Sequence, residues 1–296
     1  MYIQNIFYSI TCLMLLLSSC ASDEVRMEQT HLGGCILLSP ASEAPSDLYQ
    51  ESDIIPTDKY PPFTKALTVY GLTLIGRDDI SDDFMREVAK TVKQMFRQGE
   101  GIDSNLQKEL IRNMYRYNAV IPFYKGTDHE MTRADKEAWD LTRSQNSVCD
   151  IIMEGVPGQT TEVVEHILHY VSSIGLHYTF PDEWGVSKTS KIYYAKQTAV
   201  QNKYYDVEQY GDIEEDEVRN RVIIQELAYW VIYTAWDLRE PYGPKESEFK
   251  ITNSTDLKTK LPDLYQVYAE TIPKVMTVPD RTTLDGFEQQ YSSKTN

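Results

Sequence analysis

The first twenty residues restrict where this 296-residue chain can fold. They carry no charged side chain, and the apolar run Ile10–Leu17 is interrupted only by Thr11 and Cys12. This run is much shorter than the ~20 residues that a transmembrane helix needs, and the polar segment Ala21–Glu24 follows directly. We interpret residues 1–20 as a signal peptide, although no Lys or Arg precedes the apolar run; an uncleaved signal anchor is the alternative. Both interpretations place the rest of the chain outside the cytoplasm.

The end of this segment carries a second signal. Leu17-Ser18-Ser19-Cys20 resembles the bacterial lipobox, in which small residues precede a cysteine that is acylated and becomes the new N-terminus. The resemblance implies a lipid on Cys20 and a membrane as partner, because each buried methylene contributes ~0.8 kcal/mol of anchoring. The acidic Ser22-Asp23-Glu24 is similar to the export signal of Bacteroidetes surface lipoproteins. It implies the outer membrane and leaves a periplasmic or outward-facing orientation open.

Charge limits the partners of the rest of the chain. There are 45 acidic and 29 basic side chains, which give a net charge of -16. Nucleic acid and anionic lipid headgroups are poor partners for such a chain, because phosphate binding depends on Lys and Arg. Cations are better partners, and the length after residue 20 allows one large domain or two small ones.

The four cysteines fall into two sets. Cys12 leaves with the predicted signal peptide and Cys20 is the predicted lipid site, so Cys35 and Cys149 remain. Outside the cytoplasm these two can form a disulfide. Two cysteines define no disulfide framework, so a bond and two free thiols both stay open.

Composition changes near residue 60. Residues 21–60 are rich in Ser, Pro, Glu and Asp and have no sustained period of 2 or 3.6, apart from a brief apolar cluster at 35–38. Such a segment is typical of a flexible acidic tether. We expect one folded domain over residues 61–290.

Within that domain, the first part alternates between strand and helix patterns. Pro122 indicates an edge strand, because proline cannot donate to a sheet ladder. Beyond Thr160 the chain is largely helical, with short helices near 257–276. The pattern predicts an α+β fold in which a small sheet with flanking helices precedes a mainly helical C-terminal half. The predicted strands are 66–76, 119–124 and 148–153, and the predicted helices before Thr160 are 81–97 and part of 134–141. Residues 106–117 are either a further helix or a turn-rich segment.

The predicted helix 160–174 carries the candidate chemistry, with Thr160 as its cap and Gly175 at its end. Glu165 and His169 are four residues apart, the spacing by which two side chains of one helix bind a single zinc ion. Pairs of Glu and His on a solvated face are the alternative. The apolar face holds Val164, Ile167, Leu168, Val171 and Ile174, and the polar face holds Glu162, Glu165, His166 and His169 within about 100°.

A third ligand is predicted in the helix 217–232. Glu226 falls inside the apolar stripe of that helix, where an unpaired carboxylate is costly. A bound cation would neutralise it, and so would Arg219, Arg221 or a buried histidine in a structural network. His177, just after the first helix, is a further candidate to reach this site.

Taken with their order in the chain, these helices resemble a gluzincin-type metallopeptidase domain. They are also similar to a set of uncharacterised bacterial secreted or lipid-anchored proteins with a Glu-x-x-x-His helix and a later Gln-Glu-x-Ala-Tyr-Trp helix, here residues 225–230. The resemblance to gluzincins implies a zincin-like fold, with zinc or another divalent cation on Glu165, His169 and Glu226. The second resemblance covers about residues 67–287 and implies no known activity.

The motif differs from that of a zincin at two neighbouring positions. A zincin has a histidine ligand followed by the glutamate that acts as general base, whereas this chain has Glu165 followed by His166. The resemblance therefore assigns the role of first ligand to Glu165 and that of base to His166. Two carboxylate ligands also make metal-bound water less acidic than a histidine-rich site does. A degenerate site is therefore as compatible with the sequence as an active hydrolase.

Two functions follow from this sequence. The first is a metal-binding, zincin-like lipoprotein, either a hydrolase or an inactive relative. The second is a non-enzymatic surface lipoprotein that binds a glycan, a peptide or a partner protein. The sequence lacks a Gly-rich phosphate loop, a Gly-x-Ser-x-Gly elbow and a Cys-x-x-Cys pair, so nucleotide use and serine or redox catalysis have no support.

Overall fold

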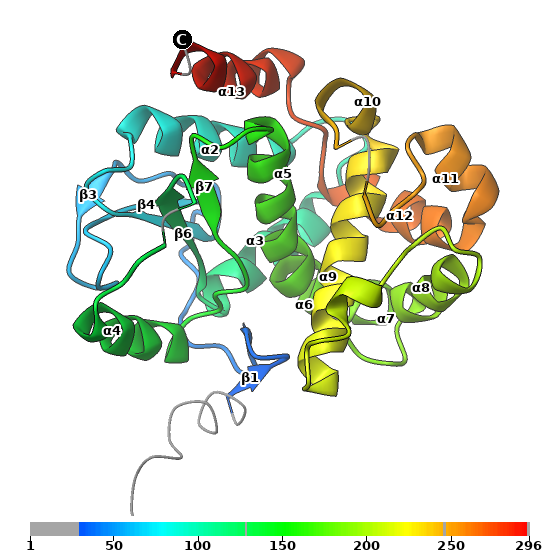
Figure 1. Cartoon of the computed structure of the whole chain (residues 1–296), viewed down its shortest axis with the longest axis horizontal. Helices are drawn as coiled ribbons and strands as arrows, with labels where there is room; N and C mark the ends of the chain where they lie inside the picture. The colour runs from blue at the N-terminus through cyan, green and yellow to red at the C-terminus, as the bar shows by residue number, and fades with distance from the viewer. Residues whose placement is uncertain (1–29, 128, 245–246, 295–296) are drawn as a thin grey trace, which may run out of the picture.

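The computed structural model describes residues 30–127, 129–244 and 247–294. A sheet-containing part and a helical part lie side by side, and the long helices α5 and α9 meet between them (Figure 1). The predicted signal peptide and Cys20 lie outside the described residues. Within those residues, no helix is both long enough and apolar enough to cross a membrane.

The strands form two sheets. A two-stranded antiparallel sheet pairs β1 with β2, and a five-stranded mixed sheet has the order β3-β4-β5-β6-β7. In the larger sheet β3, β4 and β5 are antiparallel neighbours, whereas β5, β6 and β7 run parallel. The strands are β1 (His31–Leu32), β2 (Ile36–Leu37), β3 (Ile55–Pro56), β4 (Lys65–Val69), β5 (Leu72–Gly76), β6 (Ala119–Lys125) and β7 (Ile152–Glu154).

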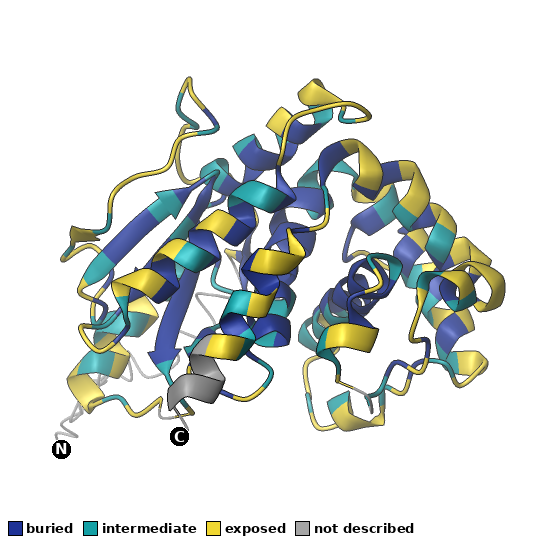
Figure 2. Cartoon of the chain, turned by 90° about the horizontal axis from the view of Figure 1, so that it is seen from above, coloured by how far each residue is buried: buried dark blue, intermediate teal, exposed yellow. Residues whose placement is uncertain are grey.

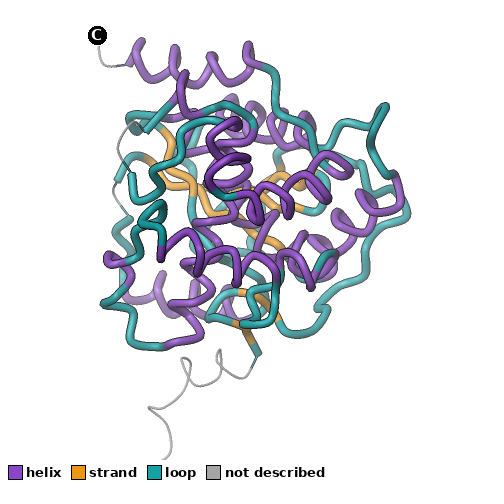
Figure 3. The backbone as a smooth tube through the Cα atoms, turned by 90° about the vertical axis from the view of Figure 1, so that its right-hand side faces the viewer, coloured by secondary structure: helices purple, strands orange, loops and turns teal. Residues whose placement is uncertain are grey.

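Helices cover the sheet and build the C-terminal half, and they lie in front of the strands when the molecule is viewed from that side (Figure 3). This confirms a mixed fold with a mainly helical second half. They are α2 (Asp82–Met95), α3 (Ser104–Arg116), α4 (Arg133–Ser144), α5 (Gln159–Tyr170), the π-helix η1 (Val171–Leu176), α6 (His177–Thr179), α7 (Pro181–Trp184), α8 (Lys191–Gln201), the 3-10 helix η2 (Glu208–Tyr210), α9 (Asp216–Ala235), α10 (Arg239–Tyr242), α11 (Ser254–Lys260), α12 (Pro262–Val275) and α13 (Arg281–Lys294).

The larger sheet has a hydrophobic core on each face, because alternate strand residues point in opposite directions. Leu67, Leu74 and Ile121 belong to the larger core, with residues of α2, α3 and α5. The opposite face carries Ala66, Ile75 and Val120, and Trp139 of α4 packs against them. Figure 2 shows the resulting buried strands between partly exposed helices.

The segment 66–76, predicted as one strand, is a hairpin of two. Lys65–Val69 pairs with Leu72–Gly76 across a two-residue turn. Tyr70 and Gly71 both have positive φ, at 47° and 88°. Two central residues of this kind form the turn whose twist matches that of the strands. Tyrosine is an unusual residue there, so the sequence did not indicate the turn.

The prediction that Pro122 marks an edge strand is wrong, because β6 lies between β5 and β7. On the side of β7, Val120 donates to the Ser147 carbonyl (3.0 Å) and Gly126 donates to the Glu154 carbonyl (2.8 Å). Residue 122 would donate to the same side. There, however, residues 148–151 leave the ladder, and β7 pairs only from Ile152. The missing N–H of proline therefore costs no hydrogen bond. Of the predicted strand 148–153, only residues 152 and 153 lie in β7.

The chain also continues as helix past Gly175, which was predicted to end it. Helix α5 begins at Gln159, with Gly158 in the left-handed conformation before it, so Thr160 is not the cap. Gly175 lies inside η1, and a Cβ there would be 2.8 Å from Leu110. Glycine is required at this position by the close approach of α3, not by a helix end.

The predicted flexible tether is packed onto the domain for much of its length. Cys35, Ile36, Leu37 and Leu48 are buried in the main core. Cys35 forms a disulfide with Cys149, 114 residues away, which settles the open question of their pairing. Residues 35–37 of the brief apolar cluster thus belong to the core, whereas Leu38 is exposed, and the segment from residue 31 is part of the described fold.

Replacing Gly71 with Ala should destabilise the protein more than the same change at Gly101. Both have a similar positive φ (88° and 83°), but an added Cβ at 71 would lie 2.7 Å from the Ile111 carbonyl, whereas none of the described atoms outside the neighbouring residues lies within 4 Å at 101. We expect a loss of roughly 1 kcal/mol for Gly101→Ala and of at least 2 kcal/mol for Gly71→Ala, measured by urea unfolding. Equal losses would contradict this packing.

Candidate metal centre

The candidate site lies where α5 and α9 pack together. Helix α5 buries Val164, Ile167 and Leu168, as predicted, and turns its polar face toward α9 and the segment before β7. Two hydrogen-bonded pairs connect α9 to α5 and to η1, which continues α5. The hydroxyls of Thr161 and Tyr233 are 3.0 Å apart, and Ser173 of η1 donates to Gln225 Oε1 at 3.1 Å. The predicted ligands lie between these two pairs along the helices.

The structure brings the three predicted metal ligands together. Glu165, His169 and Glu226 each offer one ligand atom, and these atoms lie within 4.8 Å of one another. His169 Nε2 is 3.3 Å from Glu226 Oε2, and the side chains are 1% and 16% exposed. The solvated-face alternative for this helix is therefore wrong. The group is enclosed, and it has the residue types and the spread to hold a metal ion.

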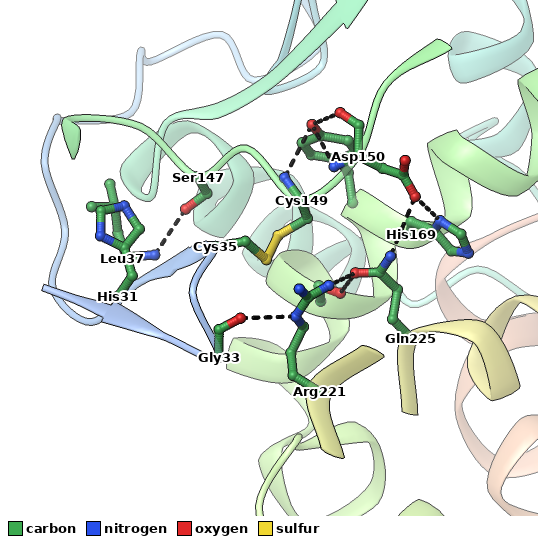
Figure 4. The surroundings of a disulfide bond; sticks show 12 residues. His31, Gly33, Cys35, Leu37, Ser147, Cys149, Asp150, His169, Arg221 and Gln225 are labelled. Atoms are coloured by element: carbon green, nitrogen blue, oxygen red, sulfur yellow. Dashed lines mark hydrogen bonds and ion pairs between the residues drawn. A yellow bond between two sulfur atoms is a disulfide. The ribbon is translucent and has the colours of Figure 1, made fainter. Parts of the chain in front are cut away.

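Asp150 is a site residue that the sequence analysis missed. Its Oδ2 lies 2.6 Å from His169 Nδ1, on the side of the ring opposite Glu226 (Figure 4). The Tyr170 hydroxyl fixes the backbone at this point, since it donates to the Asp150 carbonyl (2.6 Å) and accepts from the N–H groups of Cys149 and Asp150 (3.1 Å each). A carboxylate that accepts from one ring nitrogen directs the other toward a metal.

A second group of possible ligands shares His169. It consists of Asp150, His166 and His169. Its shortest separation, 2.6 Å between Asp150 Oδ2 and His169 Nδ1, is a hydrogen-bond length. Two ligands of a tetrahedral zinc ion lie roughly 3.3 Å apart. The 3.3 Å between His169 Nε2 and Glu226 Oε2 fits that value, so the predicted group is the better cation site.

His166, the predicted base, does not join the predicted ligands. Its Nδ1 lies 2.6 Å from the Glu162 carbonyl, to which it donates, and its Nε2 lies 3.6 Å from Asp150 Oδ1. His166 and His169 therefore flank the two oxygens of Asp150. His177 is outside both groups and accepts from the Val186 N–H at 3.3 Å.

The arginines proposed to neutralise Glu226 have other partners. Arg221 donates to the Gly33 carbonyl (3.0 Å) and to Gln225 Oε1 (2.8 Å), and Arg219 donates to the Ile213 carbonyl at 2.6 Å. The partner that faces Glu226 is His169.

Glu162, which begins the polar face of α5, has a structural role. Its Oε1 accepts from the Met153 N–H of β7 at 2.7 Å, and Gln159 Nε2 donates to the Met153 carbonyl at 2.7 Å. Gln159 Oε1 also accepts from the Gly155 N–H at 2.6 Å. Side chains of α5 thus occupy the outward-facing backbone groups of this sheet edge.

The site concentrates negative charge. Burial, together with the nearby carboxylates of Glu226 and Asp150, raises the pKa of Glu165 to about 7. His166 and His169 act in the opposite direction but do not outweigh these effects. Burial opposes ionisation of His169, but Glu226 and Asp150 outweigh it and hold the His169 pKa well above its ordinary range. Burial likewise opposes the charge on Asp150, yet His166 and His169 lower the Asp150 pKa to about 2. Protons balance this charge in the cation-free protein.

Two buried polar atoms at the site make no hydrogen bond within the described part of the chain. They are His169 Nε2, whose neighbour is Glu226 Oε2 at the ion-pair distance of 3.3 Å, and the Tyr229 hydroxyl. The Tyr229 ring lies 5.8 Å from that of His169, edge to face. On α9, Tyr229 lies between Gln225, which contacts Ser173 of η1, and Tyr233, which contacts Thr161 of α5, and it interacts electrostatically with Glu165. Unpaired buried groups are costly, and a bound ion with its water would satisfy both.

No family model, no curated protein and no solved structure matches this chain. The geometry of the site is therefore the basis for assigning a function.

The raised pKa values of Glu165 and His169 should each lower the stability of the cation-free protein as pH rises from about 5 to 8, whereas the His177 pKa, which burial lowers to about 4, has the opposite effect below about pH 6.5. The folded state keeps the Glu165 proton up to about pH 7, whereas the unfolded chain releases it near 4.5. The raised His169 pKa acts in the same direction, because its stabilisation is complete below the unfolded value of 6.5 and is lost as pH rises through the folded value. The measurement is the melting temperature in the presence of a chelator.

Glu165→Gln should remove the Glu165 contribution, so that between about pH 4.5 and 7 the melting temperature of the variant falls less, or rises more, than that of the wild type. Glu215→Gln, an exposed carboxylate before α9, is the matched control and should leave the profile unchanged. A Glu165→Gln profile parallel to that of the wild type would contradict the assignment.

Tyr229→Phe should leave the cation-free protein as stable as the wild type or more stable, because it removes a buried hydroxyl without a partner. If that hydroxyl donates to a group on the cation, the variant should gain less from added zinc by ~1 kcal/mol. Thermal unfolding with and without zinc measures both effects. A loss of more than ~1 kcal/mol in the cation-free variant would show that the hydroxyl already has a partner.

Proposed function

We propose that this chain is an exported, lipid-anchored protein whose folded domain binds a divalent cation through Glu165, His169 and Glu226. The observation that carries the proposal is that Glu165, His169 and Glu226 offer ligand atoms within 4.8 Å of one another, while the second ring nitrogen of His169, Nδ1, is held by Asp150 at 2.6 Å. This is the carboxylate–histidine arrangement that orients imidazole ligands in metal proteins.

Zinc is the first candidate for the cation. One imidazole and two carboxylates are ligands that zinc accepts, and three protein ligands leave a fourth position for water or a substrate. Ca²⁺ and Mg²⁺ fit less well, because both prefer oxygen ligands in larger number. The excess of carboxylates over histidines around the site supports a doubly charged ion, which would replace the protons on Glu165 and His169.

A zincin-like origin fits the sheet and the ligand-bearing helix, but the details support a degenerate relative over a peptidase. Two carboxylate ligands reduce the acidity of bound water, and His166 faces Asp150 instead of the ligand group. An extended peptide can bind by adding to a free sheet edge. At β7 that edge is occupied by Gln159 and Glu162.

Metal analysis of the chain from residue 21 onward tests the proposal. We expect one zinc ion per wild-type chain after loading and desalting, and a loss of affinity of at least about tenfold in Glu226→Gln and in His169→Ala. Glu215→Gln and His177→Ala, which leave the ligand group intact, should bind as the wild type does. A wild-type protein that retains no zinc, cobalt or manganese would refute the proposed site.

The anchor has an independent test. Mass spectrometry of the N-terminal peptide from cells should find acyl chains on Cys20, because the lipobox resemblance implies cleavage before this residue. Cys20→Ala should abolish the acylation and release the protein from the membrane fraction. An intact Met1 peptide from the wild type would contradict the lipid anchor.

A further inference from the structure

The first described segment of the chain is fastened beside the candidate metal centre. We call residues His31–Leu37, which contain β1 and β2, the strap. The strap lies against the segment 146–150 that leads into β7 (Figure 4). His31 Nε2 is 3.1 Å from the Asn146 carbonyl, and the Leu37 N–H donates to Ser147 Oγ at 3.0 Å. The disulfide from Cys35 to Cys149 completes this contact, one residue before Asp150.

A second connection runs from the strap through α9 to the same carboxylate. Arg221 Nε donates to the Gly33 carbonyl (3.0 Å), and its guanidinium also donates to Gln225 Oε1 (2.8 Å). Gln225 Nε2 donates to Asp150 Oδ2 at 3.4 Å, the oxygen that faces His169 Nδ1. Arg221 and Gln225 are buried, so water does not compete with these bonds.

Gly33 allows the strap to come this close to α9. Its φ is +55°, and a Cβ at this position would lie 2.6 Å from Arg221 Cβ. Its N–H also donates to Glu217 Oε1 at 3.3 Å. A glycine is thus required where the strap crosses the arginine.

Asp150 needs this support because no regular structure holds it. Residues 148–151 lie between the bridge at Ser147 and the start of β7, outside the sheet ladder. The Tyr170 hydroxyl fixes the backbone, the disulfide fixes the preceding residue, and Gln225 fixes the carboxylate. Two of these three supports depend on the strap.

We propose that the strap positions Asp150, and through it the His169 imidazole, so that cation affinity depends on the Cys35–Cys149 disulfide. This inference rests on the proposed function and adds its regulation. A thiol reductant would supply two electrons and two protons, and the S–S bond would become two S–H groups while the reductant forms its own disulfide. The strap would then keep only its hydrogen bonds, and Asp150 would orient His169 less well.

Replacing both cysteines by alanine tests the disulfide without free thiols, which would themselves bind zinc. The double variant Cys35→Ala/Cys149→Ala should unfold cooperatively but bind zinc at least about tenfold more weakly than the oxidised wild type, as expected when the partner of a ligand histidine is loosened. Gly33→Ala, which keeps the disulfide but displaces Arg221, should weaken zinc binding as well. It also tests the proposal if the double variant does not fold.

A second readout does not require a metal. The His169 Nδ1 proton, held between nitrogen and Asp150, should give a downfield NMR resonance in the cation-free wild type. We expect that resonance to shift upfield or exchange away in the double variant and in Gly33→Ala. A change confined to overall stability would leave it in place.

The outcomes separate the two proposals. A wild type that binds no cation would refute the metal site, and with it the regulation. Zinc affinity within twofold of the wild type in both folded variants, with an unchanged His169 resonance, would overturn the role of the strap and leave the metal site standing.

Discussion

Four carboxylates and two imidazoles share the contact between α5, α9 and the segment before β7, and their charges must be balanced for these elements to pack. Glu165 and Glu226 face His169 from one side, and Asp150 faces it from the other. Burial raises the pKa of Glu165, and Glu226 and Asp150 raise that of His169 in spite of burial, so bound protons balance part of this charge. In the proposed metal-bound state, one divalent ion would take the place of these protons. The packing of α5 against α9 would then depend on whether the site is occupied.

The sequence predicted the parts of this arrangement that depend on helical periodicity. The apolar face of α5, the i, i+4 pair of Glu165 and His169, and the misplaced carboxylate of Glu226 are all local patterns. Together they located the ligand group, because two amphipathic helices with polar residues in an apolar setting must bring those residues together. Whether an ion is bound there is not a property that a local pattern determines.

Asp150 could not be predicted in the same way. It lies in an irregular segment whose position is set by the neighbouring strand, at the point where Pro122 offers no hydrogen bond to β7. Pro122 is typical of an edge strand, but it lies in the inner strand β6, next to residues 148–151, which are not paired with that strand. A period of two cannot distinguish these cases, because both leave one N–H position unused. The strap escaped prediction for a related reason, since its contacts are to residues more than a hundred positions away.

The occupied edge of β7 has a consequence for the proposed lipid-anchored state, in which many copies of this protein would share one surface. Lipid-anchored molecules diffuse in two dimensions at high local density, and an open strand edge would expose each copy to pairing with the next. Gln159 and Glu162 already accept from and donate to the backbone groups that such pairing would use. At this edge, crowding on a membrane therefore does not lead to strand exchange between neighbours. The same two side chains that make β7 unsuitable for binding an extended peptide also close this edge to a strand from a neighbouring molecule.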